Sequence, residues 1–251
     1  MFLRGCPLRC SYCQNEAIQT GEDFRDIDAI KEMIAGSAPF VSGVVISGGE
    51  PTLQKDAVME LARYARSLEL KVALQTNGLF PDTLESLIGQ RLVDRIAIDY
   101  KTRWEGFSGL QGGYSTMQVE NYEKSLKRSI EICKKASRDD ILSEFEVVIT
   151  AFYENTEYIK KISAEIGTTS LVLQQGEHKI IRMREAAPDM TNGEYICKRR
   201  ILQENHPPLT LNELKAIADE LGRTVRIRTR EIGEISYESD WRCRNARKRK
   251  R

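Results

Sequence analysis

The chain has 251 residues, of which 41% are hydrophobic and 30% charged, and its formal net charge is +1. This length and composition allow one substantial buried core. The sequence contains no run of about 18 apolar residues, and Arg4 directly follows Met1-Phe2-Leu3, so we expect neither a membrane-spanning segment nor a signal peptide. We therefore expect a cytoplasmic protein.

Along the chain, short apolar runs alternate with segments in which apolar residues recur at helical spacing. This alternation is typical of βα units that form a parallel sheet. The pattern predicts strands at 44–46, 71–74, 95–98, 145–149 and 171–173. It predicts helices near 27–35, 58–68, 82–89, 119–135, 155–165 and 211–221, the last capped by Thr210. Roughly six such units predict an α/β fold that is a partial (β/α)6 parallel barrel.

Polar residues or glycines follow every predicted strand. They are Ser47-Gly48-Gly49-Glu50, Gln75-Thr76-Asn77-Gly78, Asp99-Tyr100-Lys101, Thr150 and Gln174-Gln175. Because the carboxyl ends of parallel strands meet at one rim, where ligands bind in such folds, we predict the active site there. Two long segments, 104–117 with four glycines and 176–209, are expected to be irregular.

Three of the six cysteines form a compact motif of the type C-x3-C-x2-C, with Cys6, Cys10 and Cys13. In a chain without a secretory signal, such spacing favours reduced thiols and metal ligation over disulfides. Thiolates at these intervals can hold one small iron-sulfur cluster from a single loop. Three ligands for four irons leave one iron open to a small molecule.

A structural zinc site or chance clustering is the alternative interpretation of this motif. A zinc site usually has paired C-x2-C halves or nearby histidines, and neither His178 nor His206 is close in sequence. The other cysteines, Cys133, Cys197 and Cys243, are more than 40 residues apart from one another, which gives little support for a second cluster. We expect Cys133 to lie in the core.

The cysteine motif together with Gly48-Gly49-Glu50-Pro51 closely resembles the radical S-adenosylmethionine (radical SAM) enzymes. The flanking Phe2-Leu3-Arg4-Gly5 and Asn15 resemble the activating enzymes of glycyl-radical enzymes, above all those of anaerobic ribonucleoside-triphosphate reductases. The resemblance is strong over residues 1–103. It implies a radical SAM core domain, which we place at residues 1–233, followed by a tail at 234–251.

The resemblance implies that Cys6, Cys10 and Cys13 bind a 4Fe-4S cluster whose open iron binds S-adenosylmethionine (SAM). An electron from the cluster would cleave SAM, and the resulting 5′-deoxyadenosyl radical would take a hydrogen atom from a glycine of anaerobic ribonucleotide reductase. This chemistry needs a low cluster potential, so flavodoxin or ferredoxin is the expected electron donor.

The resemblance also implies roles for residues around the cluster. Tyr12 would lie beside the adenine, Gly48 and Gly49 would let the backbone approach the ligand, and Glu50 would accept a hydrogen bond from the methionine ammonium group. The alternatives are a core aromatic, a plain turn and a helix cap, respectively. The expected cofactor-binding set also includes Asn15, Thr76 and Asn77.

Asp99 and Lys101 are two residues apart at a strand end, which places both on one face. We predict them as catalytic residues, since the resemblance implies that Lys101 binds the methionine carboxylate and Asp99 a nearby cation. A solvated ion pair is the alternative. Two residues depart from the resembled enzymes. Gln14 stands where such activases often have a histidine, and Gln75 stands where formate-lyase activase has an aspartate. A cation site like that of formate-lyase activase is therefore not expected.

The two ends of the chain leave questions open. Only five residues precede Cys6, whereas the resembled enzymes have a longer leader that completes the first strand, so we expect either a truncation or a late start. Residues 242–251 carry seven basic side chains and no acidic one. This tail can bind nucleic acid or an acidic partner surface, but a disordered, solvated terminus is the interpretation we favour.

Three further functions compete with this interpretation. The chain could activate another glycyl-radical enzyme, such as one of the pyruvate formate-lyase type, or it could act on a small molecule or on tRNA. A non-enzymatic iron-sulfur carrier or zinc module is a third alternative. It leaves the open iron and the Gly48-Gly49-Glu50-Pro51 motif unexplained.

Overall fold

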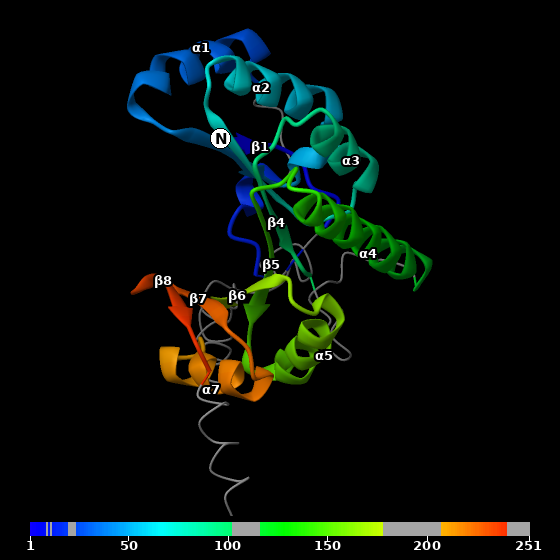
Figure 1. Cartoon of the computed structure of the whole chain (residues 1–251), viewed down its shortest axis with the longest axis vertical. Helices are drawn as coiled ribbons and strands as arrows, with labels where there is room; N and C mark the ends of the chain where they lie inside the picture. The colour runs from blue at the N-terminus through cyan, green and yellow to red at the C-terminus, as the bar shows by residue number, and fades with distance from the viewer. Residues whose placement is uncertain (9, 11, 20–23, 102–115, 178–206, 240–251) are drawn as a thin grey trace, which may run out of the picture.

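The structure is a computed structural model that describes residues 1–8, 10, 12–19, 24–101, 116–177 and 207–239 (Figure 1). Nearly all of the predicted glycine-rich loop at 104–117 and of the irregular segment at 176–209 lies outside the described residues. So do the basic tail at 242–251, Cys197 and Cys243.

One open sheet of eight strands forms the centre of the molecule, and its strands lie side by side in chain order. The first seven strands are parallel, and the last pairs antiparallel to the seventh. The five predicted strands are confirmed, and three further strands appear, at the two edges of the sheet. The strands are β1 (Phe2–Leu3), β2 (Gly43–Gly48), β3 (Lys71–Thr76), β4 (Arg95–Asp99), β5 (Glu144–Ala151), β6 (Ser170–Gln175), β7 (Val225–Thr229) and β8 (Gly233–Tyr237).

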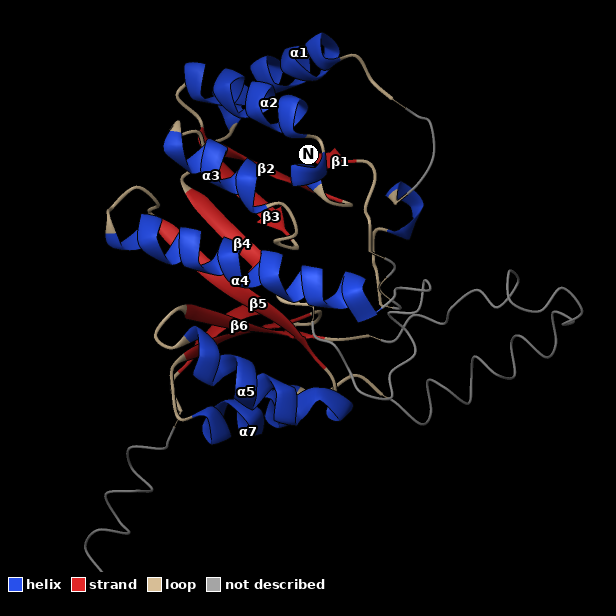
Figure 2. Cartoon of the chain, turned by 90° about the vertical axis from the view of Figure 1, so that its right-hand side faces the viewer, coloured by secondary structure: helices blue, strands red, loops and turns tan. Residues whose placement is uncertain are grey.

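All six predicted helices are confirmed. Figure 2 shows them stacked in chain order along one side of the sheet, from α1 and α2 at one end to α5 and α7 at the other. None of the helices in the described ranges is long and apolar enough to cross a membrane. The helices are α1 (Ile27–Ser37), α2 (Lys55–Ser67), α3 (Pro81–Gly89), α4 (Thr116–Arg138), α5 (Thr156–Ile166) and α7 (Leu211–Leu221), with short 3-10 turns η1 (Glu16–Ile18), η2 (Ala38–Phe40), η3 (Pro51–Leu53) and η5 (Tyr153–Asn155).

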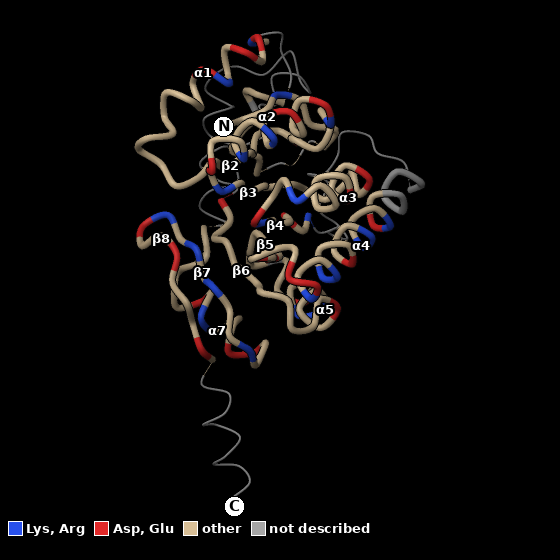
Figure 3. The backbone as a smooth tube through the Cα atoms, turned by 45° about the horizontal axis from the view of Figure 1, so that its top comes forward, with Lys and Arg blue, Asp and Glu red and all other residues tan. Residues whose placement is uncertain are grey.

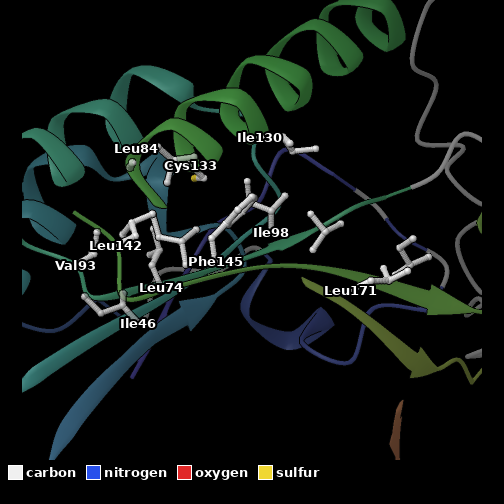
Figure 4. Close-up of a cluster of buried hydrophobic side chains, with 14 of the residues drawn as sticks. Ile46, Leu74, Leu84, Val93, Ile98, Ile130, Cys133, Leu142, Phe145 and Leu171 are labelled. Atoms are coloured by element: carbon white, nitrogen blue, oxygen red, sulfur yellow. The ribbon is translucent and has the colours of Figure 1, made fainter. Parts of the chain in front are cut away.

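The main core lies between the sheet and the helices. Alternate residues of a strand point to opposite faces, and on β5 the buried Phe145, Val147 and Ile149 belong to this core. Figure 4 shows Phe145 close to Ile98 of the adjacent β4 and to Leu74 of β3, with Cys133 of α4 nearby. Cys133 is fully buried, so its predicted place in the core is confirmed.

The opposite face of the sheet has a different composition. In its middle, Ala97, Val148 and Val172 form a small separate apolar cluster. Towards the amino ends of the strands this face is charged: the buried Glu146 of β5 accepts a hydrogen bond of 2.8 Å from Arg95 of β4. The described helices pack on the other face of the sheet (Figure 2), and the carboxyl end of this face is the rim where we predicted the site.

A hairpin of β7 and β8 forms the carboxyl-terminal edge of the sheet. β8 begins at Gly233, where we placed the end of the core domain, and continues to Tyr237. Arg228 of β7 forms an ion pair of 2.6 Å with Glu234 of β8, and Figure 3 shows basic and acidic residues side by side in this hairpin. Thr210 caps α7 as predicted, because its hydroxyl accepts from the Glu213 backbone N–H at 3.3 Å.

Candidate active site

The cysteine loop runs between β1 and η1 and is held to the sheet by backbone hydrogen bonds. The N–H of Gly49 donates to the carbonyl of Leu3 at 2.9 Å, and the N–H of Glu50 donates to that of Gly5 at 2.8 Å. At the far end of the loop, Asn15 Nδ2 donates to the carbonyl of Gly48 at 3.1 Å. The predicted residue Asn15 therefore anchors the loop to the end of β2.

Gly48 and Gly49 are required by the close approach of this loop. A Cβ atom would lie 2.1 Å from the carbonyl oxygen of Leu3 if added to Gly48, and 2.2 Å from that of Gly5 if added to Gly49. Gly48 also has φ +141°, which L side chains rarely adopt. The prediction attributed these glycines to the approach of a ligand, whereas in the structure they already accommodate the chain itself.

Glu50 is fully buried and caps η3. Its carboxylate accepts hydrogen bonds from the N–H of Thr52 at 2.9 Å, from the hydroxyl of Thr76 at 2.7 Å and from the N–H of Asn77 at 2.6 Å, and also from the Thr52 hydroxyl. Burial raises the pKa of Glu50, and these hydrogen bonds oppose the rise. Glu50 therefore forms the helix cap that the sequence offered as one of its two roles.

A cavity of about 330 Å³ lies at the carboxyl ends of the strands, a volume within the usual range of small-molecule sites. It brings together eleven of the twelve residues predicted for the site, and Glu50 is the exception. The eleven are Cys6, Cys10, Tyr12, Cys13, Asn15, Gly48, Gly49, Thr76, Asn77, Asp99 and Lys101.

The three thiols suit an iron-sulfur cluster in type, number and surroundings. All three line the same cavity. Cys6 Sγ accepts hydrogen bonds from the Leu8 N–H at 3.4 Å and from Asn77 Nδ2 at 3.9 Å. Burial raises the pKa of Cys10 to about 11, against the opposing charge of Lys101. Within the described ranges, no three Cys, His, Asp or Glu side chains are close enough together to hold a metal ion by themselves.

Lys101 and Asp99 form an ion pair of 3.1 Å at the end of β4. The Lys101 side chain is 17% exposed and that of Asp99 is 41% exposed, so the pair is partly buried, with its carboxylate open to solvent. Burial alone would lower the pKa of Lys101, but the charge of Asp99 and nearby groups hold that pKa well above its usual value. Lys101 therefore presents a fixed positive charge to the cavity.

Two aromatic residues that the sequence did not single out support this corner of the cavity. The ring of Tyr12 lies 5.2 Å from that of Phe152 and 5.5 Å from Lys101 Nζ, measured to the centroids. The Lys101 backbone N–H donates to the hydroxyl of Tyr122 on α4 at 3.0 Å. Phe152 directly follows β5 and could have been noticed as a strand-end residue, whereas no local signal marks Tyr122.

An open, mostly parallel α/β sheet with a cysteine-lined cavity at the carboxyl ends of its strands defines a class of α/β protein in which thiols are available as metal ligands at the ligand-binding rim. Residues 1–166 match the radical SAM superfamily. The chain belongs to this superfamily, as the cysteine motif and the Gly48-Gly49-Glu50-Pro51 motif predicted. Membership implies a 4Fe-4S cluster and SAM as cofactors.

Similar proteins include more than one kind of radical SAM enzyme. A Methanocaldococcus jannaschii protein provisionally described as a glycyl-radical enzyme activating enzyme is 33% identical over 188 residues, covering 71% of this chain and 72% of its own length. This similarity supports the predicted activating type. The 7-carboxy-7-deazaguanine synthase of the same organism is 25% identical over 193 residues, covering 69% and 74% of the two chains.

Solved structures agree on the fold. The crystal structure of Streptococcus suis SuiB bound to the precursor peptide SuiA matches with a TM-score of 0.51 and 15% identity, over 90% of this chain and 56% of that one. At this level of identity the likeness bears on the fold alone, and it agrees with the open parallel sheet described above.

We expect Glu50→Gln to lower the free energy of unfolding by about 2 kcal/mol, because an amide offers only one acceptor oxygen. In either orientation its NH2 group would face the N–H of Thr52 or of Asn77 and leave it unpaired. Urea unfolding of the metal-free protein measures the change, with Glu32→Gln on the exposed surface of α1 as the control. Equal stability of the Glu50 and Glu32 variants would contradict this account.

Proposed function

We propose that the chain is a cytoplasmic radical SAM activating enzyme that generates the glycyl radical of anaerobic ribonucleotide reductase. The observation that carries the proposal is that three thiols, Lys101 and Tyr12 line one cavity, with Lys101 Nζ 5.5 Å from the centroid of the Tyr12 ring. The similarity to the M. jannaschii relative supports the activating type. The choice of the reductase rests on the resemblance of the motif flanks.

In this proposal Cys6, Cys10 and Cys13 hold the 4Fe-4S cluster. When bound, the cluster supplies the electron that cleaves SAM. Hydrogen bonds to ligand sulfurs influence a cluster's potential, and the Leu8 N–H already donates to Cys6 Sγ. The donor of the electron would be flavodoxin or ferredoxin.

The residues beside the thiols would bind and orient SAM. Lys101 would pair with the methionine carboxylate, since its ammonium group is buried and keeps its proton. Asp99 would orient Lys101 through their ion pair, and Tyr12 would present an aromatic face to the adenine. In this proposal Glu50 fixes Thr76 and Asn77 beside the cavity and makes no contact with the methionine ammonium group.

A second candidate is a radical SAM enzyme that acts on a small molecule. Its support is the similarity to 7-carboxy-7-deazaguanine synthase, which extends over 69% of this chain. Enzymes of the pyruvate formate-lyase type remain alternative protein partners. The basic tail, which prompted the idea of a nucleic-acid substrate such as tRNA, lies outside the described residues.

The cluster assignment predicts that anaerobically reconstituted protein binds about four irons per chain and reductively cleaves SAM to 5′-deoxyadenosine. Cys10→Ala should lose the cleavage and most of the iron. Cys133→Ala is the matched control, because it removes a buried thiol outside the cavity and so separates loss of the cluster from loss of stability. If the Cys10 variant kept both its iron and the cleavage of SAM, the cluster assignment would be wrong.

The partner assignment predicts a glycyl-radical signal in electron paramagnetic resonance spectra when the reconstituted protein, SAM, a reductant and anaerobic ribonucleotide reductase are mixed. A reductase with its radical glycine replaced by alanine is the control and should give no such signal. If SAM is cleaved but the intact reductase gives no signal, the small-molecule alternative becomes the better account.

A further inference from the structure

The charged side chains that line the cavity are paired with one another or with close neighbours. Asp99 pairs with Lys101, Glu177 pairs with Arg230 at 3.2 Å, and Arg228 pairs with Glu234. Lys101 is assigned above to the SAM carboxylate. Among the described lining residues, the cavity therefore has no further unpaired cation for a phosphate or carboxylate. A second occupant that fits this lining is uncharged.

Carboxamides, by contrast, are abundant in the lining. Asn15, Asn77, Gln174 and Gln175 are already engaged. Gln174 accepts from Arg228 at 3.3 Å, and Gln175 donates to the Leu209 carbonyl at 2.7 Å and accepts from the Arg230 N–H at 3.1 Å. The remaining carboxamides, those of Gln14, Gln19 and Gln75, also line the cavity, and in the described part of the chain they make no hydrogen bond.

Gln14 and Gln75 are exposed, and Gln19 is 8% exposed as a whole residue. The amide atoms of these three are not among the buried atoms that lack a hydrogen-bond partner, so they are open to water or to an occupant of the cavity. Gln75 projects from the end of β3, while Gln14 and Gln19 lie on either side of η1 in the chain. The unpartnered groups thus face the cavity from both the sheet and the cysteine loop.

A carboxamide offers one acceptor oxygen and an NH2 donor, which matches the C=O and N–H of a peptide group. Glycine has no side chain, so an enzyme that selects a particular glycine must bind the peptide groups around it. We propose that Gln14, Gln19 and Gln75 bind the backbone peptide groups of the segment that carries the target glycine. This inference rests on the proposed function and names the recognition groups for its protein substrate.

The test is a double-mutant cycle on binding of a short peptide that spans the radical-bearing glycine of the reductase. The protein is reconstituted anaerobically and loaded with SAM, but without reductant, so that no turnover occurs. A second peptide carries an ester oxygen in place of the glycine N–H, which removes one backbone donor. Both peptides are titrated against wild type, Gln14→Leu, Gln75→Leu and the control Gln90→Leu, whose carboxamide instead accepts from Arg63 on the surface.

We expect the ester to raise the Kd of the wild type by about tenfold, or about 1.4 kcal/mol, and to do so equally in Gln90→Leu. In Gln75→Leu or Gln14→Leu the amide peptide should already bind about tenfold more weakly, and the ester should add little. Such coupling identifies the carboxamide that contacts the glycine peptide group.

Two results overturn the inference alone. One is an ester penalty that is the same in all four proteins. The other is a weakening of SAM binding instead of peptide binding in the glutamine variants, which would assign the carboxamides to the cofactor. Failure of the wild type to bind either peptide, together with no glycyl radical in the intact reductase, overturns the proposed function as well. The behaviour of the wild type therefore distinguishes the two failures.

Discussion

The buried carboxylate of Glu50 is the interaction on which the site depends. Its oxygens accept from Thr52, Thr76 and Asn77, while its own backbone N–H donates to the carbonyl of Gly5 in the cysteine loop. A carboxylate removed from water is costly unless hydrogen bonds replace its hydration. Four protein donors do so here, and the side chain of Glu50 thereby joins the ends of β2 and β3, while its backbone N–H holds the loop that carries the cysteines.

The division of the sheet into two faces makes room for this arrangement. Alternation along the strands sends residues such as Val147 and Ile149 towards the helices, and leaves the opposite face with a small apolar cluster and polar rim groups. Lys101 is held from both sides, by Asp99 through its side chain and by Tyr122 of α4 through its backbone. The cavity thus combines a rigid floor with a cysteine loop fixed by backbone contacts.

Sequence reasoning predicted the central elements because each is coded locally. The apolar runs of β2 to β6 and the helical periodicity between them need no information from elsewhere in the chain. The strands near the edges of the sheet were harder to predict. β1 has only two residues, and in β7 the arginines Arg226 and Arg228 interrupt the apolar pattern. Both elements become recognisable only through their pairing with a neighbouring strand.

The candidate site, too, could be predicted from the sequence only in part. Motifs and strand ends were enough to collect eleven residues that line one cavity. The sequence alone could not show why glycine is required at positions 48 and 49. The atoms that Gly48 and Gly49 accommodate belong to Leu3 and Gly5, more than 40 residues away in the chain. The cap formed by Glu50 was foreseen as an alternative, but only the positions of Thr76 and Asn77 could decide in its favour.

A crystal structure of the anaerobically reconstituted protein with its cluster and SAM would test this account most directly. The account predicts SAM in the cavity with its carboxylate against Lys101 Nζ, and Glu50 still bonded to Thr52, Thr76 and Asn77. SAM bound outside the cavity, or a Glu50 carboxylate that leaves these partners to bind the methionine ammonium group, would contradict it.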